Sequence, residues 1–114
     1  WNGMSNRVFL FEAPIDMLSY ITMNPNGWQQ NTYAASCSVA DRVLFQCLKD
    51  NPNLTEVYLC FDSDTAGQSA AKRISDKLFA QGYKSEILVP AKKDWNEELI
   101  MQKEGEQAWT EQSY

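Results

Sequence analysis

The chain has 114 residues, of which 44% are hydrophobic and 22% are charged, and its formal net charge is −5. This length and composition predict one globular domain with a substantial core, and they exclude a disordered chain. The absence of histidine excludes His-based acid–base and triad chemistry and argues against zinc, while the acidic balance argues against a self-sufficient binder of nucleic acid.

Strand and helix patterns alternate along the chain. Apolar runs predict four strands, at residues 7–11, 32–37, 57–61 and 85–89. Helical spacing predicts four helices, at about residues 14–22, 39–48 and 66–81 and from about residue 96 onward. Pro14 suits the first turn of the first helix, and Gly82 is the expected stop of the third. Residues 105–114 form a polar tail.

Each of the first three helices is expected to turn an apolar stripe inward. The inward residues are Ile15, Leu18 and Ile21 in the first, Val39, Val43, Leu44, Cys47 and Leu48 in the second, and Ala70, Ile74 and Leu78 in the third. Strands that alternate with such helices indicate βαβ units. The predicted fold is therefore α/β, with a four-stranded, mainly parallel sheet flanked by helices on both faces.

Charged residues gather where the predicted strands end. They are Glu12 and Asp16 after the first strand, Asp62 and Asp64 after the third, and Lys92, Lys93 and Asp94 after the fourth. In a parallel sheet the carboxyl ends of the strands share one edge, and ligands bind outside that edge. Four acids from two separate segments are thus expected to converge there.

Asp62 and Asp64 carry the sharpest chemical signal. Two carboxylates a few ångströms apart repel each other unless a proton or a cation lies between them. Mg2+ is held in this way, by oxygen ligands with water completing the shell. A structural alternative is a turn in which Asp64 or Thr65 caps the following helix, which explains one acid but leaves Asp62 unexplained.

Two other acidic motifs fit this segment less well. An EF-hand loop that started at Asp62 would need a glutamate at its twelfth position, where the chain has Arg73. A dehalogenase-type phosphatase carries its acid pair after the first strand, with Thr or Val two places beyond the second acid. Here the pair follows the third predicted strand, and that place holds Ala66.

Three segments together resemble the Toprim domain, the metal-binding module of bacterial primases, type IA and type II topoisomerases, OLD-family nucleases and RecR-type repair proteins. They are Phe11-Glu12-x-x-Ile15-Asp16-x-Leu18-Ser19-Tyr20, Asp62-x-Asp64-x-Ala66-Gly67 and Lys93-Asp94-Trp95-Asn96-Glu97. In this order they are similar to the Toprim-like branch found in primases and in replication or mobilisation proteins of plasmids and mobile elements. The resemblance spans about residues 7–100 and implies a Rossmann-like Toprim fold. One departure is Ala13, where the family often has glycine.

The resemblance implies a role for each charged residue at this edge. Glu12, Asp62 and Asp64 would be the catalytic and metal-binding acids, with Mg2+ as the cofactor and Mn2+ as its substitute. The possible supporting residues are Asp16, Lys93 and Asp94.

These supporting residues have alternative roles. Asp16 is either a fourth site acid or a residue that orients its neighbours, and Lys93 either contacts a phosphate or is simply solvated. Asp94 is favoured as a helix cap over a metal ligand. Trp95 is expected in the core rather than stacked on a base.

Other residues carry weaker signals. A turn role is favoured for Ser36 and Ser38, and no role is distinguished for Trp28 and Trp109. The three cysteines, Cys37, Cys47 and Cys60, lack paired spacing and are expected to be reduced thiols.

The expected function is that of a Mg2+-binding Toprim domain that supports nucleotidyl transfer or DNA strand cleavage in DNA replication or mobile-element processing. The domain, residues 1–114, is expected to be a fragment of a larger cytoplasmic protein. Its partners would be DNA or RNA, bound mainly through domains outside this chain, and not a membrane. Primase and nuclease or relaxase roles fit equally. The alternatives are a non-catalytic Toprim-like module for assembly on DNA and, third, a dehalogenase-type phosphohydrolase.

Overall fold

Four parallel strands form the central sheet in a computed structural model that describes residues 1, 3–35 and 40–112. The strands are β1 (Arg7–Phe11), β2 (Thr32–Ala35), β3 (Glu56–Cys60) and β4 (Lys84–Ile87). Their order is β2-β1-β3-β4, and every neighbouring pair is parallel. The predicted α/β class and parallel sheet are therefore confirmed.

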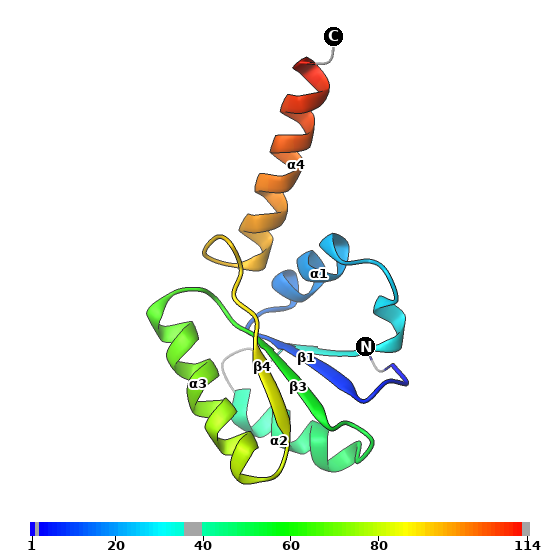
Figure 1. Ribbon diagram of the computed structural model, residues 1–114, viewed down its shortest axis with the longest axis vertical. Coiled ribbons are helices and arrows are strands. Elements are labelled where there is room, and N and C mark those ends of the chain that lie inside the picture. Colours follow the sequence, from blue (N-terminus) through cyan, green and yellow to red (C-terminus); the bar gives the residue numbers. More distant parts are fainter. Residues whose placement is uncertain (2, 36–39, 113–114) are drawn as a thin grey trace.

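Helices cover both faces of the sheet (Figure 1). They are α1 (Pro14–Met23), α2 (Ala40–Asp50), α3 (Thr65–Ala80) and α4 (Trp95–Gln112), with a short 3-10 turn, η1, at Trp28–Gln30. α2 and α3 lie on one face, while α1 and the start of α4 lie on the other. α4 then extends well beyond the sheet, through Gly105 and into the polar end of the chain. No helix among the described residues is long and apolar enough to span a membrane.

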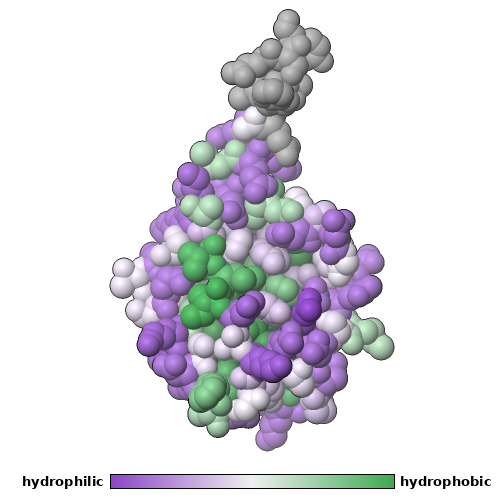
Figure 2. Space-filling view, viewed as in Figure 1, coloured by the Kyte–Doolittle hydropathy of each residue, from purple (hydrophilic) through white to green (hydrophobic). Residues whose placement is uncertain are grey.

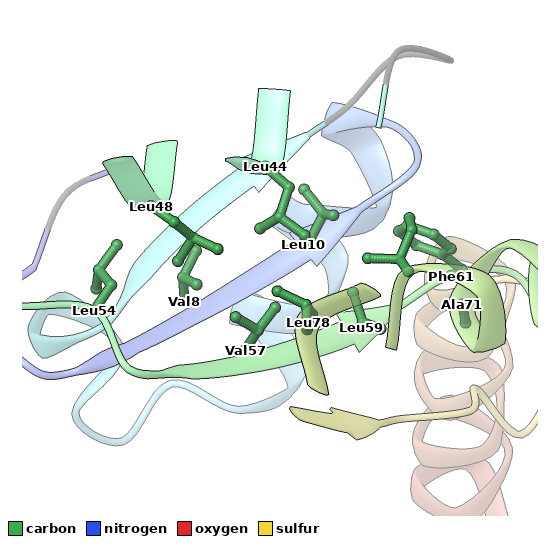
Figure 3. Close-up of a cluster of buried hydrophobic side chains, with 11 residues drawn as sticks. Val8, Leu10, Leu44, Leu48, Leu54, Val57, Leu59, Phe61, Ala71 and Leu78 are labelled. Atoms are coloured by element: carbon green, nitrogen blue, oxygen red, sulfur yellow. The ribbon is translucent and has the colours of Figure 1, made fainter. Parts of the chain in front are cut away.

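The face under α2 and α3 holds an aliphatic core. Alternate residues of β1 and β3, such as Val8 and Leu59, point toward buried side chains of the two helices (Figure 3). Leu44, Ile74 and Leu78 of α2 and α3 are buried there, as their helical spacing predicted. The third helix ends as expected, because Gly82 adopts a positive φ of 85° just beyond it.

The opposite face is aromatic. Phe9 of β1 stacks on Tyr33 and Tyr58 of the neighbouring strands, with ring centroids 5.3 and 4.6 Å apart. Tyr20 of α1 meets Trp95 of α4 edge to face at 5.0 Å. Trp95 is buried and its indole N–H donates to the Cys60 carbonyl at 3.0 Å, which confirms its expected place in the core.

The inward face predicted for α1 is wrong. Ile15 and Leu18 are 55% and 56% exposed, whereas Asp16 and Ser19 are buried. The helix is rotated from the expected orientation because Tyr20 packs among the aromatic rings and Asp16 faces the start of α4. Ile21 is half-buried, as expected.

Most element boundaries agree with the prediction to within two residues. β3 and β4 each begin one residue earlier than expected, and β4 ends at Ile87 instead of continuing to Val89. The predicted roles of Ser36, Cys37, Ser38 and Val39 lie outside the described residues, as do the side chains of Val43 and Trp109. Cys60 is buried and Cys47 is half-buried, and both are free thiols.

An ion cluster joins α2 to α3. Asp41 of α2 pairs with Arg73 and with Lys77, whose Nζ lies 2.6 Å from Oδ2. The hydrogen bond from Lys77, supported by Arg73, holds the pKa of Asp41 below its ordinary value. The ionised form of Asp41 therefore stabilises the fold, and this contribution is lost as the pH falls through the lowered pKa.

We expect Asp41→Asn to reduce the free energy of unfolding by up to about 1 kcal/mol at neutral pH, the range of partly exposed ion pairs. The loss should shrink as the pH falls from about 3.9, the unfolded value, through the lowered pKa of folded Asp41, where the wild-type carboxylate also becomes protonated. Urea denaturation across pH measures it. Asp76→Asn on α3, an acid without an ion pair among the described residues, is the control. Equal pH profiles for the two variants would contradict this role.

Candidate metal centre

The ends of β1 and β3 bring two acids into contact. Phe11 is the register partner of Cys60, so the chain leaves both strands at the same level of the sheet. The backbone N–H of Asp62 donates to Oε1 of Glu12 at 3.3 Å. Both residues are half-buried. The convergence of Glu12 and Asp62 at one edge, predicted from the topology, is present in the structure.

The second acid of the pair serves as a helix cap. Oδ1 of Asp64 accepts from the backbone N–H of Gly67 at 2.7 Å, which satisfies one of the free donors at the start of α3. The Asp64 side chain is exposed, and only Oδ1 takes part in the cap among the described residues. The cap therefore accounts for one carboxylate oxygen of Asp64.

The first turn of α3 lies directly against the end of β3. Gln68 Nε2 donates to the Asp62 carbonyl at 2.9 Å. A Cβ atom at Gly67 would clash with that same carbonyl oxygen and would lie 3.0 Å from Oε1 of Glu12. Glycine at position 67 is thus what lets the helix approach the two acids so closely.

A third segment reaches the site from the end of β4. The backbone N–H of Ser63 donates to the Lys93 carbonyl at 2.8 Å, and its hydroxyl donates to the Lys92 carbonyl at 2.8 Å. Asp94 then caps α4 by accepting from the N–H of Glu97 at 2.8 Å, the role that the sequence favoured. The side chains of Lys92 and Lys93 are exposed, so they border the site in the solvent.

Asp16 connects this third segment to α1. It is only 5% exposed and its Oδ1 accepts from the backbone N–H of Asn96 at 3.3 Å. Ser19, one turn further on, lies 3.2 Å from the side-chain oxygen of Asn96. Burial and the nearby charge of Asp94 raise the pKa of Asp16, while the Asn96 hydrogen bond opposes them. Asp16 therefore positions α4 and also adds negative charge beside the site.

The electrostatics of the edge centre on Asp62. Partial burial, together with the negative charges of neighbouring carboxylates, raises the pKa of Asp62 to about 6; these neighbours are Glu12, Asp16, Asp94 and Asp64. Within the described ranges, however, no three acidic or cysteine side chains are already grouped closely enough to hold a metal ion. The carboxylates are thus close enough to influence one another's ionisation, but they do not enclose a metal-binding position.

The sequence did not predict the contacts of several residues that shape this site. Ser63 and Gln68 hold the β3–α3 turn through main-chain carbonyls, and Asn96 meets Asp16 across 80 residues of sequence. A polar residue between two acids is an ordinary turn signal, so only the fold shows what Ser63 contacts. Ser36 and Ser38, at the end of the second predicted strand, lie outside the described residues.

The fold and these acids define an α/β domain with a carboxylate-rich site at the carboxyl ends of parallel strands. The sequence profile of the Toprim-like family matches residues 9–99. The chain therefore belongs to the Toprim-like family, which confirms the resemblance drawn from its motifs and leaves the dehalogenase alternative without support.

Two further relatives are similar to this chain. It is 26% identical over 98 residues to the uncharacterized protein MG010 of Mycoplasma genitalium. This match covers 84% of the chain and 43% of that protein. The crystal structure of the primase fragment of the bacteriophage T7 primase-helicase protein matches it with a TM-score of 0.64 at 22% identity. This match covers 100% of the chain and 46% of the fragment, and it shows the likeness of the fold. The chain spans less than half of either relative.

The raised pKa of Asp62 predicts that ionisation of this side chain lowers the free energy of unfolding as the pH rises. Because the folded pKa of about 6 lies above the unfolded value of about 3.9, stability is lost as the pH rises between these values. We expect the stability gained by Asp62→Asn over wild type to grow between about pH 4 and 7 when divalent ions are absent. Urea denaturation of both proteins measures this gain. A gain that stays constant with pH, or one shared by the control Asp76→Asn, would contradict the prediction.

Proposed function

We propose that this chain is a Mg2+-binding Toprim-like domain that supports nucleotidyl transfer or DNA strand cleavage in a primase-like or mobile-element DNA-processing protein. The observation that carries the proposal is the contact between Glu12 and the backbone of Asp62. It brings acids from the ends of two neighbouring strands together, with Asp64 two residues away.

The donor set at this edge fits a hard divalent cation. Every candidate ligand is a carboxylate, and the chain has no histidine. Mg2+ commonly keeps several waters and takes only one or two protein carboxylates, so a closed three-acid cage is not required. Asp62 and Asp64 would hold the ion, and Glu12 lies close enough to Asp62 to act as a third ligand or through a bridging water.

Each residue then has a defined role. Bound Mg2+ would polarise a phosphoryl oxygen and offset the charge that develops on it. Glu12 would move a proton as general acid or base, since its carboxylate lies at the site and is only half-buried. Lys93, exposed beside Asp94, is free to contact a phosphate group, and Asp16 keeps α4 in position through Asn96.

The comparisons favour a substrate of the nucleic-acid class. The similar solved structure is named as the primase fragment of a primase-helicase protein. The Toprim resemblance implies Mg2+ as the cofactor. The net charge of −5 makes it reasonable that strong contacts to DNA or RNA come from other domains of the parent protein.

A non-catalytic module for assembly on DNA is the second candidate. One observation favours it: among the described residues the acids form no ready-made metal cluster, and Asp64 and Asp94 already serve as helix caps. In that case the acidic edge would be a structural remnant, and metal would not affect the domain.

Metal binding should separate the two candidates. We expect Mn2+ or Mg2+ at millimolar concentration to raise the melting temperature of wild type, because an ion that binds only the folded state stabilises it. The double variant Asp62→Asn with Asp64→Asn should show no such rise. Asparagine is also a good helix cap, so the start of α3 is retained in the variant.

Asp41→Asn, which removes an acid on α2, is the control and should keep the full metal-dependent rise. Equal rises in wild type and in the double variant would mean that the ion binds elsewhere, and the assembly module would then be preferred.

Glu12→Gln tests catalysis. Glutamine keeps the oxygen that accepts from Asp62, so the fold of the turn is preserved while the titratable carboxylate is lost. In the whole protein we expect strand cleavage or nucleotide addition to fall roughly 10²-fold or more, the usual effect of removing a positioned proton-transfer group. DNA affinity should change little. Unchanged turnover at saturating Mg2+ would reject a catalytic role for Glu12.

A further inference from the structure

The two outer edges of the sheet differ, because the start of the chain covers one of them and no described strand pairs with the other. Beside β2, Trp1 exchanges backbone hydrogen bonds with Tyr33 at 3.1 and 2.8 Å, and Gly3 donates to the Thr32 hydroxyl at 3.2 Å. The start of the chain thus covers that edge. The other edge is β4, whose residues are exposed except for half-buried Ser85, and no described strand pairs with its outer side.

The outer side of β4 carries backbone groups that suit a further strand. The N–H groups of Lys84 and Leu88 donate inward, to the Thr55 and Leu59 carbonyls of the β3 side. Because the direction alternates along a strand, the N–H and C=O groups of Ser85 and Ile87 point away from β3. An unpaired row of this kind is a template for edge-to-edge pairing.

The charge pattern of β4 is complementary to that of a second, antiparallel copy of the same strand. If a second β4 lies antiparallel with Ser85 opposite Ser85, then Lys84 faces Glu86 of the other copy, and the same pair forms again across the two-fold axis. Both side chains are exposed, and neither forms an ion pair with any described residue. Opposite charges placed directly across two strands favour this register.

The apolar residues show the same complementarity. Figure 2 shows an apolar patch where β4 ends and the chain turns toward α4, and Ile87 and Val89 there are exposed. Phe79, at the end of α3, is 82% exposed and lines an open hollow of about 760 Å3 together with Tyr83 and residues of β4. Antiparallel pairing would place the Phe79 end of one copy on the Ile87 end of the other, which would bury apolar surface at both ends.

We propose that β4 is a self-association surface, through which two copies of this chain pair antiparallel about Ser85 to form one continuous eight-stranded sheet. Two Lys84–Glu86 pairs set the register, and Phe79 of each copy packs on Ile87 of its partner. The partner is a second copy, and not an unrelated strand, because both the charge pattern and the apolar pattern fit their own two-fold images.

Charge reversal tests this interface through sedimentation velocity over a range of protein concentrations, in about 0.15 M salt to screen the repulsion between two acidic chains. Lys84→Glu alone, and Glu86→Lys alone, should each weaken dimerisation about tenfold or more, because both cross-strand pairs become repulsive. An equimolar mixture of the two variants should restore dimers, since the heterodimer regains two opposite-charge pairs. Phe79→Ser should also weaken association.

Amide hydrogen exchange separates edge pairing from other contacts. In a dimer of this kind the amides of Ser85 and Ile87 should become protected as the protein concentration rises, while circular dichroism confirms that every variant is folded. A chain that stays monomeric up to about 1 mM, the weak end of specific association, overturns the proposal. So does a dimer that the charge reversals leave unchanged, or a mixture of variants that fails to associate.

Discussion

The pairing of β1 with β3 is the constraint on which the rest of this domain depends. Five consecutive residues of each strand are in parallel register, so both strands end at the same level. Glu12 and Asp62 then leave the sheet side by side, although they are 50 residues apart in sequence. A register shift of a single residue would separate these acids. It would also move the side chains of the shifted strand to the opposite face of the sheet, because side chains alternate between the faces. Packing on both faces therefore also fixes the geometry of the site.

The mutual repulsion of the acids is offset by the way the helices begin. α3 and α4 both start at this edge, and their N-terminal caps, Asp64 and Asp94, are themselves members of the acidic group. The positive end of each helix dipole favours nearby negative charge, which offsets part of the repulsion between these carboxylates. Asp62 and Asp16 still bear part of the cost of this repulsion and of burial, as their raised pKa values indicate.

The sequence was most informative where one residue type has few uses. Acids directly after apolar strands predicted the edge of the sheet and its chemistry, since carboxylates there have no packing role. It was least informative for α1, where Ile15 and Leu18 follow helical spacing yet face outward, while Asp16 and Ser19 are buried. That orientation depends on partners distant in the sequence, the aromatic ring of Trp95 and the backbone of Asn96. Local periodicity carries no information about such partners, nor about the main-chain contacts of Ser63 and Gln68.

Gly67 shows that packing and chemistry can restrict neighbouring residues of one short segment for independent reasons. Any side chain at this position meets the Asp62 carbonyl, so the restriction comes from the backbone and applies whether or not the acids do chemistry. A descendant of this chain with no use for the acids would be free to replace Asp62 and would even gain stability by doing so, yet it would still need glycine at position 67. In diverging copies, position 62 would therefore record whether the acidic site was kept, while position 67 would record only whether the fold was kept.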